Sequence, residues 1–347
     1  MDGIRVIRVW SYITANEGFV RRILDYQSFM LSATLAAPFV RGVDLVVGTS
    51  PQFFTACAAY LVSLLKRIPF VFELRDMWPE SIKAVGAMKD SAAIRFLERI
   101  EMFLYRKAAR IVTVTHAFRN TLMRRGIDGN KIDVVTNGVD LSHFAPQIKD
   151  AELVEQLGLR DTFVAGYIGT HGMAHALETL LAAAETLQQM PAAQNVRLVF
   201  LGDGARKAAI AEQARAMGLR NVLFLDSVSK QQVVRYWSVL DVSVIHLRKT
   251  ELFTTVIPSK LFECMGMGLP VLHGVAGESA EIVLREQVGE VFESENAQQL
   301  VTGLLRMRDE PTAYTNFQKN GLAAAQRYDR KNLALKMLQV FTDLLTK

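Results

Sequence analysis

The chain has 347 residues, half of them hydrophobic, with a formal net charge of +5 at neutral pH and two cysteines. This length suits two domains of ordinary size, each with its own core. No apolar run approaches the ~20 residues that a bilayer-spanning helix needs, and we see no signal peptide, so we expect a cytoplasmic protein with reduced cysteines rather than an integral membrane or secreted one.

The positive charge is concentrated in the first part of the chain. Residues 1–147 hold 19 Lys and Arg against 13 Asp and Glu, whereas residues 148–347 hold 21 against 22. Such an excess indicates an anionic partner. We find no basic helix-turn-helix and no aromatic stacking platform, so we expect no nucleic acid. An anionic membrane surface and a chance excess of surface cations both stay open.

Strands and helices alternate over the first 126 residues. Residues rich in β-branched and aromatic side chains predict strands at 4–10, 44–48, 70–73 and 111–115. Helices are predicted at 19–40, at about 51–66 with Ser50 as N-cap, at 92–110, and in a segment that ends at Gly126. Strand–helix–strand alternation at this spacing predicts a doubly wound parallel sheet.

The loop after the strand at 70–73 is richer in functional groups than a connector requires. It carries Arg75, Asp76, Trp78 and Glu80. Open α/β sheets bind ligands at the carboxyl ends of their strands, where this loop lies. The alternative is a structural network of Arg75 and Asp76, with Trp78 as packing.

The predicted helix at 92–110 has a basic face. Arginines spaced four, seven and four residues apart fall along it beside aromatic residues, as a peripheral membrane surface requires: Arg95, Arg99, Arg106 and Arg110. Glu98 and Glu101 dilute this charge, so an ordinary solvated face is the alternative. After the turn at Asn137-Gly138 we place domain boundaries that give segments 1–146, 147–329 and 330–347.

Two glycine turns follow strands in the second half of the chain. The strand at 163–168 leads into Gly169-Thr170-His171-Gly172, and the strand at 196–201 leads into a turn that begins at Gly202. Glycines let backbone amides approach phosphate, and a helix N-terminus adds its dipole. His171 is followed four residues later by a second histidine, but no third metal ligand is evident, so we expect no metal.

The densest cluster of polar residues opens a helix predicted at 258–267. Its first proline suits the first helical turn, and Ser259 and Lys260 then lie at a helix end that favours phosphate. Glu263 lies one turn further and can accept hydrogen bonds from two ribose hydroxyls. The alternative is an ordinary helix start with Lys260 and Glu263 as a solvated pair.

Three of these segments resemble a known family. Pro-Ser-Lys-Xaa-Xaa-Glu at 258–263, Arg-Asp-Xaa-Trp-Pro-Glu-Ser at 75–81 and Asn-Gly-Val-Asp at 137–140 resemble retaining GT-B glycosyltransferases of the family 4-like type. The likeness is closest to the fucosamine-transferase-like branch of bacterial O-antigen and capsule synthesis. It implies an α/β fold of two Rossmann-like, doubly wound domains facing a cleft, the first on the acceptor side and the second binding the nucleotide sugar. It also implies that the last segment holds a helix, at about 330–345, that crosses back onto the first domain. By this likeness the chain begins at the third strand, so we expect the N-terminal domain to be incomplete.

The resemblance also implies a reaction. It is transfer of a hexosyl or acetamido sugar from a nucleotide sugar, with UDP expected, to a lipid-linked saccharide, without a metal or other cofactor. Peripheral contact with the cytoplasmic membrane would fit such an acceptor. Asp76 is expected near the acceptor hydroxyl, Arg75 near phosphates or the acceptor, and Lys260 at the donor phosphates. The expected donor-binding residues are Gly169, Thr170, His171, Gly172, Gly202, Asp226, Ser259, Lys260, Glu263, Glu278 and Ser279.

The chain departs from the wider family at one position. The family pairs the equivalent of Glu263 with a glutamate eight residues earlier, and Thr255 stands there. Two other functions stay open at this point. One is a non-catalytic nucleotide-sugar binder, which an incomplete first domain would suit. The other is a sugar-nucleotide epimerase of the same fold, which would need no acceptor.

Overall fold

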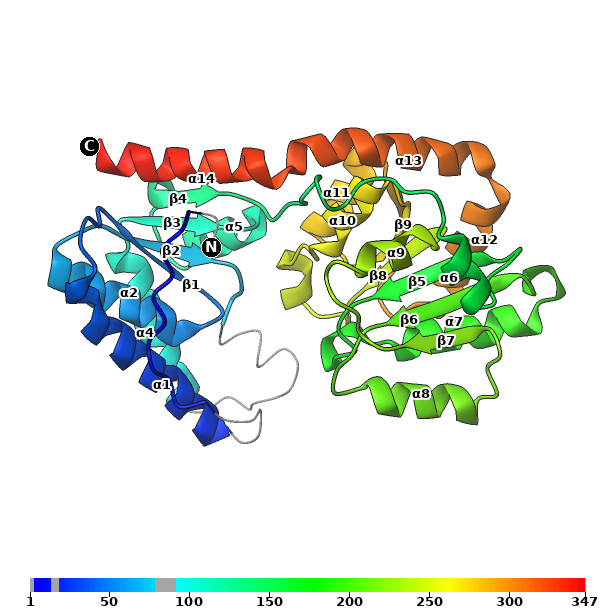
Figure 1. Ribbon diagram of the computed structural model, residues 1–347, viewed down its shortest axis with the longest axis horizontal. Coiled ribbons are helices and arrows are strands. Elements are labelled where there is room, and N and C mark those ends of the chain that lie inside the picture. The colour runs from blue at the N-terminus through cyan, green and yellow to red at the C-terminus, as the bar shows by residue number, and fades with distance from the viewer. Residues whose placement is uncertain (1–2, 14–18, 79–91, 347) are drawn as a thin grey trace. The chain divides into compact units, whose positions relative to one another are not determined.

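A computed structural model describes residues 3–13, 19–78 and 92–346 (Figure 1). The chain divides into two compact units. The first comprises Met1–Thr136 and Leu335–Lys347, and the second comprises Asn137–Ala334. The domain boundaries at residues 146 and 329 stay predictions.

The first unit is built on a four-stranded sheet in the order β1-β2-β3-β4. Every neighbouring pair is parallel, which confirms the predicted parallel sheet. The strands are β1 (Val46–Thr49), β2 (Phe70–Leu74), β3 (Arg110–Thr113) and β4 (Ile132–Val134). The connecting helices are α1 (Phe19–Ala36), α2 (Phe53–Lys66), α4 (Ala92–Lys107) and α5 (His116–Arg124), and η1 (Ala37–Phe39) continues α1.

Three predictions for this unit are wrong. Arg110 does not lie on the basic face of a helix, because α4 ends at Lys107 and Arg110 begins β3. Residues 4–10 form no strand, and Ile4 and Trp10 are 70% and 69% exposed. β-branched residues favour a strand only where a neighbouring strand accepts their hydrogen bonds and covers one face. Ser50 is not the N-cap of α2 either, because Gln52 holds that position.

The second unit has a six-stranded parallel sheet in the order β10-β9-β8-β5-β6-β7. The strands are β5 (Phe163–Ile168), β6 (Val196–Leu201), β7 (Val222–Leu225), β8 (Val242–His246), β9 (Val271–Gly274) and β10 (Gly289–Val291). From the centre of the sheet, β5, β6 and β7 follow one another toward one edge, and β8, β9 and β10 follow one another toward the opposite edge. The order therefore reverses between β5 and β8, which is the switch point where doubly wound sheets bind ligands.

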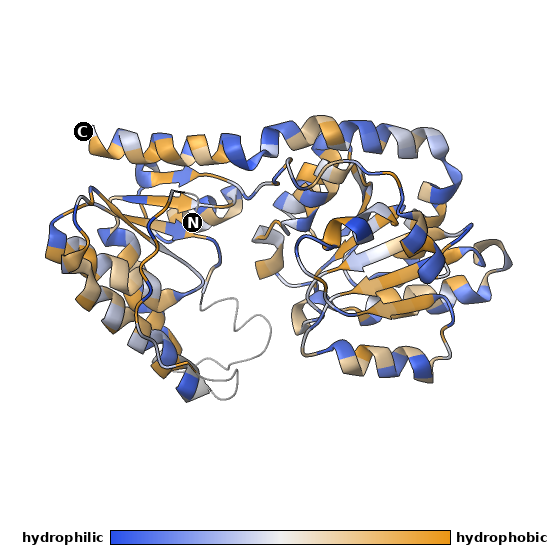
Figure 2. Cartoon of the chain, in the orientation of Figure 1, coloured by the Kyte–Doolittle hydropathy of each residue, from blue (hydrophilic) through white to orange (hydrophobic). Residues whose placement is uncertain are grey.

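Helices surround this second sheet. They are α6 (Ala151–Gln156), α7 (Glu178–Gln189), α8 (Lys207–Ala216), α9 (Val233–Ser238), α10 (Lys260–Met267), α11 (Glu278–Glu286), α12 (Ala297–Asp309) and α13 (Pro311–Ala325). The last helix, α14 (Arg330–Leu345), only begins in this unit. Residues of α14 from Leu335 onward belong to the first unit. Much of the strand ribbon is orange in Figure 2, which marks hydrophobic residues, whereas the helices alternate orange with blue.

Alternation along the strands explains how the sheet is covered. Val242 and Val244 of β8 point into a core that α7, α8 and α12 complete. Ser243 lies between them and therefore faces the opposite side, where α10 packs on β8. Across the first face runs a row of aromatic residues, because Tyr167 pairs in register with Phe200 and Phe200 with Phe224.

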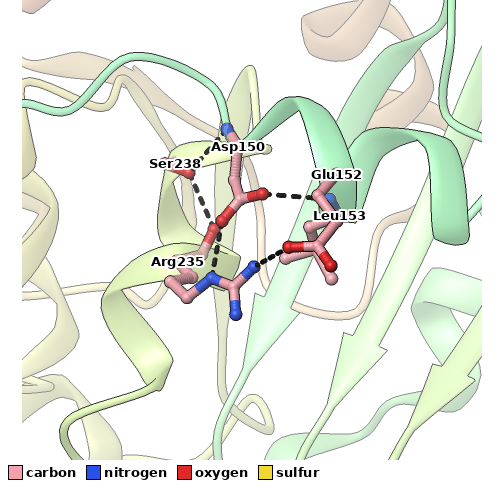
Figure 3. A network of polar contacts seen from close by, with 5 residues as sticks. All are labelled: Asp150, Glu152, Leu153, Arg235 and Ser238. Carbon is pink, nitrogen blue, oxygen red and sulfur yellow. Dashed lines mark hydrogen bonds and ion pairs between the residues drawn. The ribbon is translucent and has the colours of Figure 1, made fainter.

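A polar network holds α6 to α9 (Figure 3). Asp150 accepts a hydrogen bond from the Leu153 amide at 3.0 Å as N-cap of α6, and it pairs with Arg235 of α9 at 2.5 Å. Arg235 also reaches Glu152 at 3.2 Å. The hydrogen bond from Arg235 lowers the pKa of Asp150. The carboxylate therefore contributes stability above its unfolded pKa, and that contribution is lost as the pH falls through the folded value.

Asp150→Ala is expected to lower the melting temperature at neutral pH by roughly 2–4 °C, because it removes a helix cap and an ion pair together. Differential scanning calorimetry measures this change. Glu212→Ala is the matched control, since it removes an exposed pair with Arg215 inside a single helix. A decrease of equal size in the control would contradict a special role for the network.

Candidate functional site

The switch point of the second sheet brings two predicted segments together. The turn Gly169–Gly172 follows β5, and the N-terminus of α10 follows the loop that leaves β8. An alanine-like Cβ at Gly169 would overlap the end of the Lys260 side chain, so the two segments touch there. The structure thereby joins residues that lie about ninety positions apart in the sequence.

Lys260 carries a charge for which no described residue is a counter-ion. Its ammonium Nζ lies 4.1 Å from the centre of the Tyr167 ring, and the side chain is half-buried. Across the described ranges, no hydrogen bond or ion pair involves this ammonium. Burial lowers the Lys260 pKa to about 8, against the smaller opposing effects of Cys264 and Glu263. A partly desolvated ammonium without an ion pair is a suitable site for an anion.

The two glycine turns are packed on each other. Gly169 and Gly202 have φ values of +146° and +147°, which few other residues adopt. A Cβ at Gly202 would overlap the carbonyl oxygen of Gly169. Hydrogen bonds from Gly169 N to Leu201 O (2.8 Å) and from His171 N to Asp203 O (2.9 Å) continue the sheet pairing into the turns. The turns therefore form one rigid edge beside Lys260.

The remaining residues of the first turn differ in what they offer. Thr170 is exposed, and its carbonyl oxygen accepts a hydrogen bond from the Tyr167 hydroxyl at 2.7 Å. Gly172 is extended at a φ of −107°, so its conformation does not require glycine. Thr170 is thus exposed to solvent, while the Tyr167 hydroxyl holds its main-chain carbonyl group.

His171 lies beneath the turn rather than on it. Its imidazole is fully buried beside the Tyr167, Phe200 and Phe224 rings, at centroid distances of 5.8, 6.3 and 6.5 Å. Neither ring nitrogen has a hydrogen-bond partner in the part of the chain that the structure describes. Burial, with the nearby cations Lys207 and Lys260, lowers the His171 pKa to about 4, so the ring is neutral at pH 7. The side chain supports the turn, and a contact with the donor sugar stays a prediction.

Ser259 and Glu263 lie at the start of α10. Ser259 is the N-cap, its side chain is exposed, and its hydroxyl makes no capping hydrogen bond. The Glu263 carboxylate is half-buried, and burial raises its pKa, against the smaller opposing effects of Lys260 and Arg330. No hydrogen bond or ion pair of this carboxylate occurs among the residues described. Lys260 and Glu263 are therefore not an ion pair, which argues against the solvated-pair alternative.

The start of α11 has fewer side-chain groups available to a ligand than the sequence predicts. The Ser279 hydroxyl is buried and hydrogen-bonded to Nε2 of the buried His273 at 2.7 Å. Only the main chain of Ser279 is therefore available to a ligand. Glu278 opens the helix and is half-buried. The first amides of a helix lack intrahelical partners, so an anion could still bind at this end.

Asp226 forms an ion pair with Lys207, a residue that the sequence did not single out. Its exposed carboxylate binds Lys207 Nζ at 2.5 Å, and this hydrogen bond lowers the Asp226 pKa. Lys207 Nζ also donates to the carbonyl oxygen of Leu225 at 3.1 Å. Lys207 thus brings a second positive charge to the edge that holds Lys260. Its only sequence signal is its position just after a glycine turn.

In the first unit, Ser50 organises the loop of Arg75 and Asp76. The buried Ser50 hydroxyl oxygen accepts from the Arg75 and Asp76 amides at 2.9 and 3.1 Å and donates to Asp76 O at 3.1 Å. Trp78 stacks on Phe53 with ring centres 4.9 Å apart, so Trp78 does pack against the fold, as the structural alternative predicted. Arg75 is exposed and Asp76 is half-buried. Glu80 lies outside the described residues.

The described residues show neither a metal centre nor a membrane span. Over residues 3–13, 19–78 and 92–346, no group of three or more His, Cys, Asp or Glu side chains could hold a metal ion. Over the same ranges, no helix has both the length and the apolar character needed to cross a bilayer. The expectation that no cofactor is required stays a prediction.

Two family models match the chain. Residues 1–138 match the model described as "Glycosyl transferase 4-like domain", and residues 162–310 match "Glycosyl transferases group 1". Among curated proteins, "Probable glycosyltransferase WbjE" of Pseudomonas aeruginosa is 24% identical over 259 residues, which are 74% of this chain and 63% of that protein. WcaI of Escherichia coli, a colanic acid biosynthesis glycosyl transferase by name, is 24% identical over 74% of this chain and 64% of its own length. The chain thus spans slightly less than two thirds of these relatives.

Solved structures agree on the fold. Anabaena Alr3699/HepE in complex with UDP superposes with a TM-score of 0.75 at 17% identity, covering 91% of this chain and 82% of that one. Sucrose-phosphate synthase from Thermosynechococcus elongatus gives 0.73 at 19% identity, covering 92% and 78%. These likenesses identify the fold as GT-B and confirm the predicted fold class.

Proposed function

We propose that the chain is a glycosyltransferase that uses a nucleotide-sugar donor. The premise is that residues 1–138 form a glycosyl transferase 4-like domain and residues 162–310 a glycosyl transferases group 1 domain. One observation carries the proposal. The Lys260 ammonium is half-buried beside the rigid glycine turns at the switch point of the second sheet, and none of the described residues is its counter-ion. A diphosphate would supply the missing negative charge.

The donor is a UDP-sugar in this proposal. The diphosphate binds Lys260 and the turn amides of Thr170 and Gly172, since those of Gly169 and His171 are used in pairing the two turns. The ribose hydroxyls donate to Glu263. Glu263 suits this role because its partly buried carboxylate has acceptor atoms that no described residue uses. The UDP found with the Anabaena neighbour supports the choice of nucleotide.

The transfer retains the anomeric configuration in this proposal. The acceptor oxygen forms its bond to the anomeric carbon as the bond to the diphosphate breaks, on the same face of the sugar. The acceptor proton passes to an oxygen of the leaving diphosphate. Lys260 stabilises the developing phosphate charge, and Asp76 and Arg75 orient the acceptor hydroxyl.

The acceptor is a lipid-linked saccharide of surface polysaccharide synthesis, as in the O-antigen and capsule branch. The printed names of the WbjE and WcaI relatives support the general class of reaction. Peripheral contact with the cytoplasmic membrane would bring the enzyme to such an acceptor. In support, α4 exposes Phe96 (59%) and Phe103 (42%) on a helix rich in arginine.

Calorimetric titration of the chain with UDP and then with GDP tests the donor site. We expect UDP to bind and GDP to bind more weakly. No binding of either nucleotide to a folded sample would overturn the proposal. UDP binding without sugar transfer to any saccharide acceptor would instead favour a non-catalytic binder, and conversion of the donor without an acceptor would favour an epimerase.

Glu263→Gln is expected to weaken UDP binding about tenfold and to reduce the preference for UDP over 2′-deoxy-UDP, because a carboxylate accepts stronger hydrogen bonds than an amide. Calorimetry with both nucleotides measures this change. Glu281→Gln, an exposed carboxylate in α11, is the control. An unchanged preference in Glu263→Gln would place the ribose elsewhere.

A further inference from the structure

Tyr167 lies under the donor site without reaching its surface. It is the penultimate residue of β5, a central strand of the second sheet, and it is 1% exposed. Its ring lies 6.3 Å from Phe200, which stacks on Phe224 at 4.8 Å. The aromatic row therefore fixes the Tyr167 ring from the side, so the ring has one defined orientation.

Two groups of the donor site rest on this side chain. The ring lies beneath the Lys260 ammonium at 4.1 Å, which is within cation–π distance. The hydroxyl donates to the carbonyl oxygen of Thr170 at 2.7 Å. One buried residue thus contacts both the cation and the turn that would meet the donor phosphates.

Lys260 has little else to hold it. Its four-carbon stem is flexible, and no described residue forms an ion pair with its ammonium. Gly169 leaves the space that the side-chain end occupies, since a Cβ there would overlap it. The ring face is therefore the contact that decides where the ammonium lies.

We infer that Tyr167 is a positioning residue of the donor site, which holds the Lys260 ammonium where the donor diphosphate binds. The inference rests on the proposed function. It differs from a general packing role because it requires Tyr167 to act on ligand binding through Lys260.

Four titratable groups face the Lys260 ammonium. Glu263 and Cys264 lie on its own helix, and His171 and His175 approach from the turn after β5. Burial lowers the pKa of both histidines to about 4 and raises the pKa of Cys264 to about 12. These three groups therefore stay neutral from pH 6 to pH 9, and Glu263 is the neighbouring acidic group.

A double-mutant cycle tests the inference by calorimetry with UDP. Tyr167→Leu removes the ring and is expected to weaken binding at least tenfold. In the Lys260→Ala background the same change should alter binding by no more than about threefold, the loss allowed for the hydroxyl, since the residue acted upon is gone. Tyr167→Phe keeps the ring and should stay within about threefold of the parent. Equal losses from Tyr167→Leu in both backgrounds would overturn the inference.

A second measurement needs neither UDP nor a variant that might fail to fold. In the parent protein, the ε-methylene protons of Lys260 should show an upfield ring-current shift in the NMR spectrum, because the ammonium bonded to that carbon lies over the ring. The absence of that shift would overturn the contact. If the shift is present and UDP does not bind, the proposed donor site fails while the contact stands, so the two failures are distinguishable.

Discussion

Lys260→Ala is expected to weaken UDP binding by roughly 10- to 100-fold, the range for losing a hydrogen-bonded charge pair to phosphate. The effect is large because no counter-ion of Lys260 occurs in the described ranges, so the diphosphate would be its charge partner. Isothermal titration calorimetry measures the affinity. Lys319→Ala, which removes an exposed lysine of α13, is the matched control. Unchanged affinity in Lys260→Ala would remove this residue from the phosphate site.

The same site predicts a pH dependence. Burial lowers the Lys260 pKa to about 8 in the free protein, and the diphosphate binds the protonated form. UDP affinity should therefore be higher at pH 7, where most of Lys260 is protonated, and should fall as the pH rises through about 8. Lys260→Ala should abolish this alkaline decrease. A decrease that persists in the variant would assign it to another group.

Asp76→Asn is expected to lower sugar transfer by about 100-fold or more while UDP affinity stays within about twofold. The proposal places Asp76 at the acceptor hydroxyl and not at the donor, so only the chemical step should change. Ser50 holds the main chain of Asp76 through two hydrogen bonds. Asparagine keeps the shape of the side chain, so the loop should stay in place.

Transfer is measured with a UDP-sugar and a saccharide acceptor that the parent enzyme uses. Asp44→Asn serves as the control, because Asp44 is exposed and lies outside the candidate site. Parental turnover in Asp76→Asn would rule out a catalytic role for Asp76. A parallel loss of UDP affinity would instead point to a disturbed fold.

Much of the local structure follows from sequence patterns. The apolar runs at 163–168 and 196–201 coincide with β5 and β6, and the segment at 330–345 coincides with α14. These elements are predictable because strand and helix periodicities lie within a few residues of chain. Residues 4–10 have the composition of a strand but form none, since strand pairing depends on a partner elsewhere in the chain.

Some residues of the candidate site can likewise be predicted from local sequence, and others cannot. Gly169 and Lys260 belong to local patterns, so their residue types alone indicate a phosphate site. Serine is equally suitable as a helix cap and as a loop anchor, so sequence could not assign Ser50 to the loop of Arg75 and Asp76. Nor could it reveal that the Ser279 hydroxyl is used by His273.

Most strands and helices, though not the expected strand at 4–10, can be predicted from the sequence, as can the residue types that could bind a nucleotide sugar, because both depend on short-range pattern and chemistry. The pairing of Lys207 with Asp226, the burial of His171 and the position of the Tyr167 ring beneath Lys260 are evident in the folded chain alone. These contacts depend on the reversal of strand order between β5 and β8 and on in-register pairing across the sheet, which bring residues far apart in the chain to one edge.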